Sequence, residues 1–166
     1  MAIIEREWYA VRVRSRHEKS CAKNFELREI LYFLPTYRSK QRWSDRIKEV
    51  ELPLFPGYIF CNIQAPSFWP ILATPGVVQI IGRGNAPEPV APEEIAAVQK
   101  LVASGGAVPW PYLESGQRVR LIDGAFRGLE GILDTQGGKD RVVVNVKLLH
   151  KAIAVEVDRG FIEPCR

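Results

Sequence analysis

The chain has 166 residues and a formal net charge of +4, with 46% hydrophobic and 25% charged residues, an ordinary composition for a globular protein. Its length allows one domain or two small ones and excludes a large multidomain enzyme. The longest uncharged stretch, residues 52–82, contains five prolines, which excludes a membrane-spanning helix there.

The N-terminal part of the chain predicts a strand, a helix and a projecting hairpin. Residues 7–13 are rich in β-branched and aromatic side chains and predict a strand, whereas residues 17–31 combine helix formers with spaced apolar residues. Residues 34–37 predict extended structure. Residues 38–49 are polar and charged, which suits a hairpin or loop that projects into solvent.

The uncharged stretch and the residues after it predict further strands and helices. Residues 54–60 combine a Pro-Gly turn with an apolar strand, residues 68–73 predict a short helix, and residues 76–81 predict another strand. A longer helix is expected to begin at Pro92, because proline is favoured at the first helical position and acidic residues in the first turn. This half is therefore expected to alternate strands and helices around one sheet.

A change of character follows residues 104–111, which are rich in glycine, proline and small side chains and predict a linker. After them, apolar residues alternate with the period of a strand and glycines separate the runs. About five short strands in roughly fifty residues predict a small barrel. The predicted domains are residues 1–103 and 114–166, joined by a linker over residues 104–113.

Positive charge is concentrated near the N-terminus. Between Arg12 and Lys48 the chain has 11 basic and 4 acidic residues, interleaved with aromatic side chains. Nucleic-acid phosphates would take the cations while bases stack on the rings. The same pattern fits a solvated face whose aromatic residues belong to the core, and composition alone favours neither interpretation.

The sequence offers little material for catalysis or metal binding. Three widely spaced cysteines and two distant histidines, His17 and His150, predict neither a zinc site nor a disulfide framework. We therefore expect a binding protein rather than an enzyme, without catalytic residues, metal or cofactor. Charged residues near the N-terminus, with no apolar block before a cleavage site, predict no signal peptide and hence a cytosolic protein.

Three motifs occur in order along the chain. Residues 116–132, GQRVRLIDGAFRGLEGI, look like a KOW motif; W-Y-A-V lies at 8–11; and L-F-P-G-Y-I-F at 54–60 is followed by T-P-G-V at 74–77. Together they resemble the NusG family over nearly the whole chain. The resemblance implies an α+β protein with an N-terminal α/β NGN domain, whose helices flank an antiparallel sheet. It also implies a C-terminal KOW domain that is an SH3-like β-barrel.

Within that family, segments 15–19, 33–35, 42–46 and 53–56 look more like operon-specific antitermination paralogues of the RfaH and UpxY type than like housekeeping NusG. The resemblance implies a transcription elongation factor that binds bacterial RNA polymerase and the non-template DNA strand and suppresses pausing or termination. A housekeeping NusG-type elongation and termination factor is one alternative. The other, from a different class, is a ribosome-associated KOW module that binds RNA through Arg118, Arg120, Arg127, Lys139, Arg141 and Lys147.

Relatives contact polymerase through an apolar surface beside the F-P-G-Y segment, which implies contacts from Phe55, Pro56, Tyr58 and Phe60. Because successive strand residues face opposite ways, Tyr58 and Phe60 are expected to share a face. For Phe60 and Trp8 a position in the core is at least an equal alternative. Tyr58 is the favoured contact, because aromatic side chains with a polar tip are enriched at interfaces.

Alignment of the first strand with RfaH-like relatives implies contacts with non-template DNA from the loop and helix that follow. Arginines suit phosphates or a guanine edge, and an asparagine amide suits a base edge. RfaH also has a polar patch that touches the opposing polymerase lobe, but residues 67–70 of this chain, SFWP, do not reproduce it. The implied DNA-binding residues are Arg14, Arg16, His17, Asn24 and Arg28. For His17, a solvated position at the start of the helix is the favoured alternative.

In the KOW domain, the resemblance places a partner-binding turn at Leu149, His150 and Lys151. Relatives bind Rho or a small-subunit ribosomal protein through this turn, and nascent RNA is a third candidate. The Phe and Gly usual in housekeeping members are absent here, which argues against strong Rho binding. Leu148 continues the strand alternation and is expected in the core, with Leu149 exposed. We expect this domain to be β-structured when free, because β-branched residues dominate and glycines would interrupt long helices.

Overall fold

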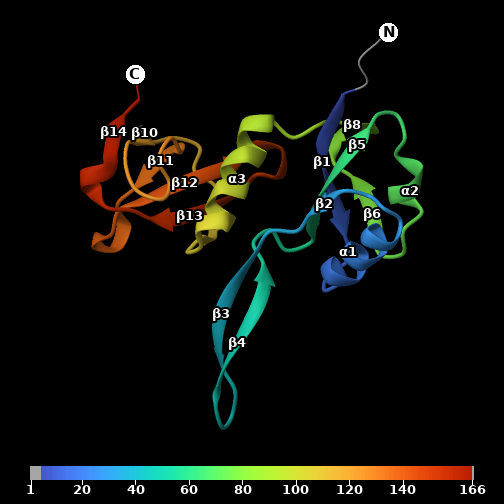
Figure 1. The fold of residues 1–166 in the computed structure, drawn as a ribbon, viewed down its shortest axis with the longest axis horizontal. Coiled ribbons are helices and arrows are strands. Elements are labelled where there is room, and N and C mark those ends of the chain that lie inside the picture. Colours follow the sequence, from blue (N-terminus) through green and yellow to red (C-terminus); the bar gives the residue numbers. More distant parts are fainter. Residues whose placement is uncertain (1–4, 166) are drawn as a thin grey trace. The chain divides into compact units, whose positions relative to one another are not determined.

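The computed structural model describes residues 5–165. The chain divides into two compact units, whose elements are labelled in Figure 1. One unit comprises the described residues up to Pro35 together with Phe55–Pro92, and the other comprises Thr36–Leu54 and the described residues from Glu93 onward. Within residues 5–165, no helix has the length and apolar character needed to cross a membrane.

A four-stranded antiparallel sheet forms the centre of the first unit. Its spatial order is β2-β5-β1-β6. In the β1–β5 pair, Arg6 lies opposite Gln64 and Arg12 lies opposite Tyr58, so the end of β1 lies beside the start of β5. The strands are β1 (Arg6–Val13), β2 (Tyr32–Phe33), β5 (Tyr58–Gln64) and β6 (Val77–Ile80).

Helices α1 (Glu18–Leu27) and α2 (Trp69–Leu72) cover one face of this sheet (Figure 1). Alternate residues of β1 and β5 point to that face, as the strand period requires. Val11 and Ile59 pack there with Phe25 of α1 in one hydrophobic cluster. The helices thereby fix which face of the sheet is core.

Two predicted elements of this unit have shifted ends. The helix predicted over 17–31 ends at Leu27, because Glu29 adopts a left-handed backbone conformation with φ of 58°. The strand predicted over 54–60 begins at Tyr58, because a turn precedes it in which the Tyr58 N–H donates to the Phe55 carbonyl at 3.0 Å. A small pair of strands, β7 (Gly82–Arg83) and β8 (Ala86–Pro87), also belongs to this unit.

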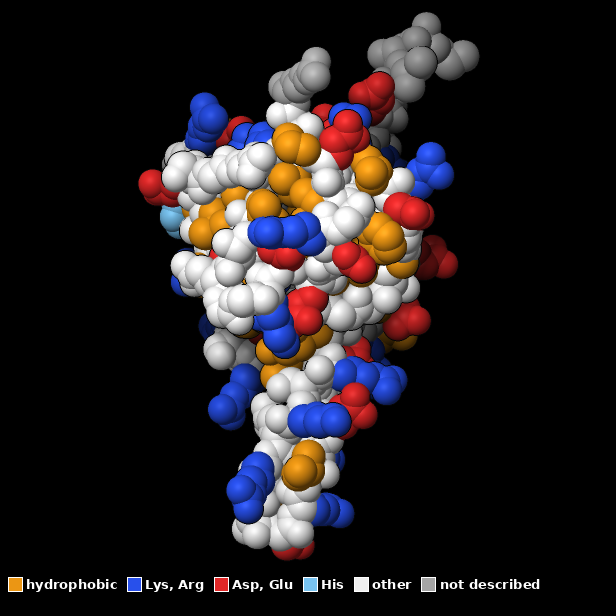
Figure 2. Space-filling model, turned by 90° about the vertical axis from the view of Figure 1, so that its left-hand side faces the viewer, with side chains coloured by type: hydrophobic (Ala, Val, Ile, Leu, Met, Phe, Trp, Pro, Cys, Tyr) orange, Lys and Arg blue, Asp and Glu red, His pale blue; other side chains and the backbone are white. Residues whose placement is uncertain are grey.

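Strands β3 (Thr36–Arg42) and β4 (Ile47–Pro53) form the hairpin expected from the polar segment. Near its tip, the ammonium of Lys48 lies 4.7 Å from the centre of the Trp43 ring, a cation–π contact. Figure 2 shows Lys and Arg side chains along this projection, at the bottom of the view. The exposed basic residues of the hairpin include Arg38, Lys40, Arg42, Arg46 and Lys48.

The second unit also contains helix α3 (Pro92–Ser104) and a six-stranded antiparallel sheet. The helix begins at the predicted proline and buries Ile95, Val98 and Leu101 at helical spacing. The sheet has the order β14-β10-β11-β12-β13-β9. Its strands are β9 (Val108–Trp110), β10 (Arg118–Leu121), β11 (Glu130–Asp134), β12 (Arg141–Val146), β13 (Lys151–Glu156) and β14 (Ile162–Pro164).

Strand β9 lies inside segment 104–113, which the sequence predicts as a linker. Val108 pairs with Ala154 of β13, and Trp110 pairs with Ala152. Residues 108–110 are therefore part of the C-terminal sheet. A strand-length hydrophobic pattern was hidden here by Pro109 and Pro111, residues that usually indicate a break in regular structure.

The alternation predicted for the C-terminal strands is only partly observed in β12 and is wrong beyond it. Val142, Val144 and Val146 are buried as expected, but Val143 between them is buried as well. After Val146 the chain enters a short 3₁₀ turn, Lys147–Leu149, which breaks the two-residue period. Leu149 is consequently buried at 8% exposure and Leu148 only half-buried, so the expectation that Leu149 is exposed is wrong.

Candidate functional site

Two Pro-Gly turns meet at the end of β1. The Val13 N–H donates to the carbonyl oxygen of Gly57 at 2.8 Å, and the next N–H, that of Arg14, donates to the carbonyl oxygen of Gly76 at 2.8 Å. The loop of residues 14–17 follows directly, and its first N–H group is the one bonded to Gly76. The F-P-G-Y turn, the T-P-G-V turn and the basic loop, three separate sequence motifs, therefore form one structure, which we call the turn–loop site.

The F-P-G-Y turn depends on its glycine. Gly57 has a φ of +87°, in the region that side chains with a Cβ rarely adopt. Its N–H donates to Oε1 of Glu18 at 2.9 Å. Since Glu18 is the first residue of α1, this bond ties the turn to the start of the helix.

The T-P-G-V turn packs directly against α1. Gly76 has a φ of +93°, and a Cβ at this position would lie 2.9 Å from Sγ of Cys21. The Cys21 thiol donates to the Pro75 carbonyl at 3.3 Å. Burial, and then the nearby Glu18 carboxylate, raises the pKa of Cys21, so the thiol stays neutral and is a poor nucleophile.

The loop between the turns presents exposed basic side chains. Arg14, Arg16 and His17 are all exposed, and Arg16 has a left-handed φ of 65°. Nδ1 of His17 lies 2.9 Å from the carbonyl oxygen of Ser15, a contact that orients the imidazole. The structure thus brings together three of the five residues predicted to bind DNA, in a geometry open to an anionic ligand.

The other two predicted DNA-binding residues have contacts inside the unit. Arg28 donates from Nη1 to the Pro70 carbonyl at 2.9 Å and to Oγ1 of Thr74 at 3.1 Å, which joins α1 to α2. Asn24 donates from Nδ2 to the carbonyl of Ser20 at 3.1 Å. A guanidinium has five N–H donors, so Arg28 retains donors for a ligand. In the structure, however, its hydrogen bonds hold α2 against α1.

The predicted polymerase-binding residues divide into buried and accessible pairs. Phe55 and Phe60 are 1% and 0% exposed, and their rings meet edge-on with centroids 5.6 Å apart. Phe60 also stacks on Phe33 at 6.2 Å. Pro56 is exposed and Tyr58 is half-buried. The structure therefore favours the core alternative for Phe60, extends it to Phe55, and leaves Pro56 and Tyr58 able to contact a partner.

Residues 67–70, where a polar patch was not reproduced, form an apolar surface. Trp69 is 75% exposed at the start of α2, and Leu72 of the same helix is also exposed. Phe68, in contrast, packs edge-on against Tyr9 with ring centroids 5.1 Å apart. The exposed indole of Trp69 was not predicted from the sequence.

The predicted partner-binding turn of the C-terminal unit is less open than expected. Leu149 is buried, whereas His150 and Lys151 are exposed. The imidazole of His150 stacks on the ring of Tyr112 with centroids 4.0 Å apart and planes inclined by 29°. Lys151 is therefore the member of the predicted trio that has the freest access to a partner.

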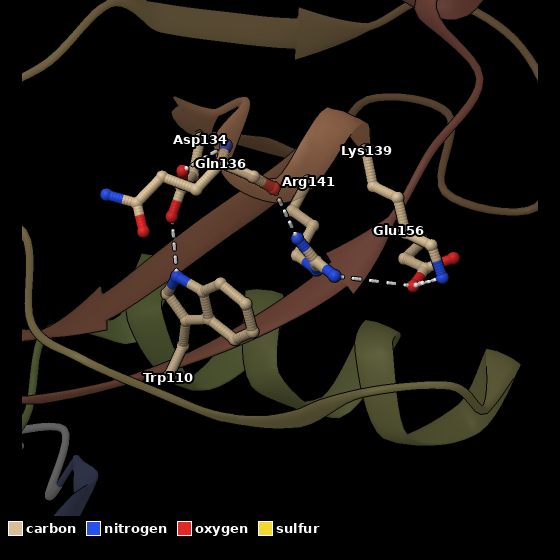
Figure 3. A network of polar contacts seen from close by, with 6 residues as sticks. All are labelled: Trp110, Asp134, Gln136, Lys139, Arg141 and Glu156. Atoms are coloured by element: carbon tan, nitrogen blue, oxygen red, sulfur yellow. Dashed lines mark hydrogen bonds and ion pairs between the residues drawn. The ribbon is translucent and has the colours of Figure 1, made fainter.

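A polar network anchors β9, an edge strand of this sheet (Figure 3). The Trp110 indole N–H donates to Oδ2 of Asp134 at 2.7 Å, and the Gln136 N–H donates to Oδ1 at 2.9 Å. These two bonds, the backbone one first, lower the pKa of Asp134. The guanidinium of Arg141 lies over the Trp110 ring at 4.5 Å and donates to the Gln136 carbonyl at 3.1 Å.

Several cations assigned to the RNA-binding alternative are already paired. Arg118 and Arg120 lie 3.7 and 2.6 Å from the Glu130 carboxylate, and the Arg120 bond is the main cause of the lowered pKa of Glu130. Lys139 and Arg141 share the carboxylate of Glu156 at 3.2 and 3.6 Å. Such pairing reduces the positive charge offered to a phosphate backbone, which weakens that alternative.

Glu18 is the important residue of the turn–loop site that sequence reasoning missed. It lies in a basic segment and reads as an ordinary first-turn acid of a helix. Its burial at 7% exposure and its bond to Gly57 become visible only in the structure. The available signal was the Pro-Gly turn itself, whose glycine N–H needs an acceptor where the turn shields it from water.

The family model described as "Transcription termination factor nusG" matches residues 6–99. The transcription termination/antitermination protein NusG of Lactococcus lactis is 29% identical over 172 residues, covering 94% of this chain and 91% of that protein. The protein of the same name from Pseudomonas aeruginosa is 27% identical over 175 residues, covering 95% and 98%.

A solved structure of Thermotoga maritima NusG, described as showing domain interaction, matches 98% of both chains with a TM-score of 0.57 at 18% identity. This likeness concerns the fold, and it confirms the predicted α+β class: an N-terminal sheet with helices followed by a β-rich C-terminal unit. Since the family model covers more than half of the sequence, the chain belongs to the NusG family of transcription termination and antitermination factors.

Proposed function

We propose that this protein binds bacterial RNA polymerase and the non-template DNA strand during elongation and suppresses pausing or termination. The observation that carries the proposal is the turn–loop site, where an apolar Pro-Gly turn and an exposed basic loop are joined by backbone hydrogen bonds at the end of β1. A polymerase surface and a nucleic-acid strand that run side by side would meet both parts at once.

The polymerase contact is assigned to Pro56 and Tyr58, supported by their accessibility and by the uncharged character of residues 52–82. The buried rings of Phe55 and Phe60 pack edge-on against each other and support the turn. Arg12 lies opposite Tyr58 in the sheet and is exposed, so the apolar contact borders directly on positive charge. This arrangement suits a protein surface located next to nucleic acid.

The DNA contact is assigned to Arg14, Arg16 and His17, with Asn24 and Arg28 as outer members. Their side chains offer donors to phosphate oxygens, which position a strand without reading its sequence. Binding should therefore be general for exposed single-stranded DNA. A sequence preference would require base-edge contacts, for which His17 and Asn24 have suitable groups.

An operon-specific role of the RfaH and UpxY type is the finer proposal, supported by segments 15–19, 33–35, 42–46 and 53–56. The housekeeping alternative is supported by the general NusG names of the relatives. Transcript profiles of a strain lacking the protein separate the two. Loss of distal transcripts from one long operon supports the specialised role, and changes across many operons support the housekeeping one.

For the C-terminal unit we propose a partner contact at His150 and Lys151, with Rho, a small-subunit ribosomal protein and nascent RNA as candidates. The proposed domains remain residues 1–103 and 114–166 with a linker at 104–113, of which residues 108–110 pair with the C-terminal sheet. We place the protein in the cytosol, where polymerase acts, without a cofactor or catalytic residue.

Tyr58→Ala tests the polymerase contact. Truncating an interface hot spot typically costs about 2 kcal/mol or more, so the affinity for core polymerase should fall by roughly 30-fold. Binding is measured by titration of labelled polymerase, with circular dichroism as the folding check. Tyr37→Ala, which removes a half-buried tyrosine of the hairpin, is the matched control. Unchanged affinity in a folded Tyr58→Ala protein would refute the contact.

A further inference from the structure

The Glu18 side chain is an unusual feature of the turn–loop site. Among the described residues 5–165, Glu18 and Asp134 are the only buried carboxylic acids. A buried carboxylate is costly unless its oxygens accept hydrogen bonds. Asp134 is explained by Trp110 and Gln136, whereas Glu18 accepts from a single backbone group, the N–H of Gly57.

That bond completes a clamp around the F-P-G-Y turn. The N–H of Gly57 is held by Glu18 at the start of α1, and the carbonyl of Gly57 is held by the N–H of Val13 at the end of β1. The residues between Val13 and Glu18 are the basic loop itself. Both ends of the loop are thus bonded to the same glycine, one through the backbone and one through a side chain.

We propose that Glu18 is a positioning residue that makes the polymerase-contacting turn and the DNA-contacting loop one rigid, bivalent surface. The proposal rests on the proposed function. When two contacts belong to one rigid body, formation of the first raises the effective concentration of the second. When the contacts move independently, ordering the second costs conformational entropy at the moment of binding.

The Glu18 carboxylate is suited to this role for a chemical reason. A hydrogen bond from a backbone N–H to a carboxylate is shorter and stronger than one to a neutral acceptor. An amide oxygen at the same position still accepts the bond, whereas a methyl group does not and a thioether sulfur accepts only weakly. Glu18→Gln should therefore preserve the clamp, and Glu18→Ala or Glu18→Met should open it.

The clamp can be tested in the free full-length protein by amide hydrogen exchange measured by NMR. We expect the exchange rate of the Gly57 amide to rise by at least about 10-fold in Glu18→Ala and Glu18→Met, and to stay near the wild-type rate in Glu18→Gln. Glu26→Ala, which removes an exposed acid of the same helix, is the control. Unchanged Gly57 exchange in folded Glu18→Met would overturn the clamp, independently of any partner.

The coupling can be tested with polymerase on two nucleic-acid scaffolds, one with an exposed non-template strand and one without it. The ratio of the two affinities measures the benefit of DNA contact. We expect Glu18→Met to lower this ratio several-fold and Glu18→Gln to restore it, whereas Tyr58→Ala lowers both affinities. A purely structural role for Glu18 would weaken both scaffolds equally and leave the ratio unchanged.

The outcomes distinguish this inference from the proposed function. If wild-type protein binds polymerase and the ratio is unaltered in Glu18→Met with raised Gly57 exchange, the coupling is wrong and the proposed function stands. If wild-type protein does not bind either scaffold, the proposed function is wrong and the coupling fails with it. A lower ratio in Glu18→Met, restored in Glu18→Gln, supports both.

Discussion

The F-P-G-Y turn of the first unit and the His150 turn of the C-terminal sheet both carry predicted contacts, but different forces hold them. The first is fixed through the backbone: the N–H and the carbonyl of Gly57 are both hydrogen-bonded. The second also has a backbone bond, from the His150 N–H to the Lys147 carbonyl at 3.1 Å, but its imidazole packs on a side chain from a distant segment. That side chain is Tyr112, two residues after the anchored Trp110.

This difference has consequences for how each turn responds to change. A turn held through its backbone groups tolerates new side chains at its tip, provided that the glycine and the Glu18 acceptor remain. A side-chain-held turn depends on a segment well before it in the sequence, so a deletion far from the turn should disturb it. The C-terminal contact is therefore expected to be the more sensitive to domain boundaries, and the N-terminal contact to backbone substitutions.

The largest expected effect comes from removing the segment that holds the His150 turn. A fragment of residues 114–166 lacks β9, Trp110 and Tyr112, whereas a fragment of residues 107–166 retains them. We expect the shorter fragment to lose about 3 kcal/mol of unfolding free energy, the usual cost of deleting a packed tryptophan. Urea denaturation of both fragments measures the difference. Trp110→Ala in the longer fragment should reproduce most of this loss of unfolding free energy. Equal stabilities of the two fragments would show that β9 does not contribute.

The next effect tests the backbone-held turns. Gly76→Ala should lower the unfolding free energy by about 2 kcal/mol or more, because a left-handed alanine is strained and its Cβ would meet Sγ of Cys21. Gly57→Ala is the matched control: it has a similar φ, but its Cβ would lie no closer than 3.8 Å to the Val13 carbonyl. We expect that variant to lose about 1 kcal/mol, from strain alone. Thermal denaturation compares the two, and a larger loss at Gly57 would contradict this explanation.

Much of the chain up to the end of α3 was predictable because its signals are local. The strand at β1, the short helix at α2 and the proline that begins α3 follow from residue types within each segment. The polar segment 38–49 predicted the hairpin. The turn–loop site was predictable in its parts, since Pro-Gly turns and a basic loop are sequence features. That these parts meet was not predicted, because it depends on backbone bonds from Val13 and Arg14 to glycines far away in the sequence.

The remaining features depend on contacts between distant residues. Leu149 is buried because a 3₁₀ turn replaces the last strand residues, which no alternation pattern reveals. Phe55 is buried because its ring meets Phe60 across the turn. The role of Trp110 depends on Asp134, 24 residues later in the chain. Each of these positions has an ordinary residue type whose environment is set by tertiary structure.

A smaller effect concerns the pH dependence of the side-chain-held region. The pKa of Asp134 is lowered from 3.8 because its carboxylate accepts from Gln136 and Trp110. A lowered native pKa stabilises the fold above the unfolded pKa, and this stability is lost as the pH falls through the native value. The C-terminal unit should therefore weaken below about pH 4. Asp134→Asn should cost about 1 kcal/mol at neutral pH and flatten this acid dependence, as followed by tryptophan fluorescence; an unchanged acid profile would exclude Asp134 as its origin.

The smallest expected effect tests the charge presented by the backbone-held turn. Each lost phosphate contact should reduce the salt dependence of single-stranded DNA binding, the slope of log K against log salt, by roughly 0.7. The Arg14→Ala, Arg16→Ala double variant should therefore lower the slope by roughly 1.4. Lys139→Ala with Arg159→Ala removes the same charge from the C-terminal unit and should leave the slope nearly unchanged.

Because Gly57 and Gly76 hold the loop through its flanking backbone groups, the arginine variant should keep its fold and its apolar polymerase contact. Titration of an elongation complex at several salt concentrations gives the slopes. Equal slopes in the two double variants would mean that the protein's net charge, and not the position of its loop, governs DNA binding.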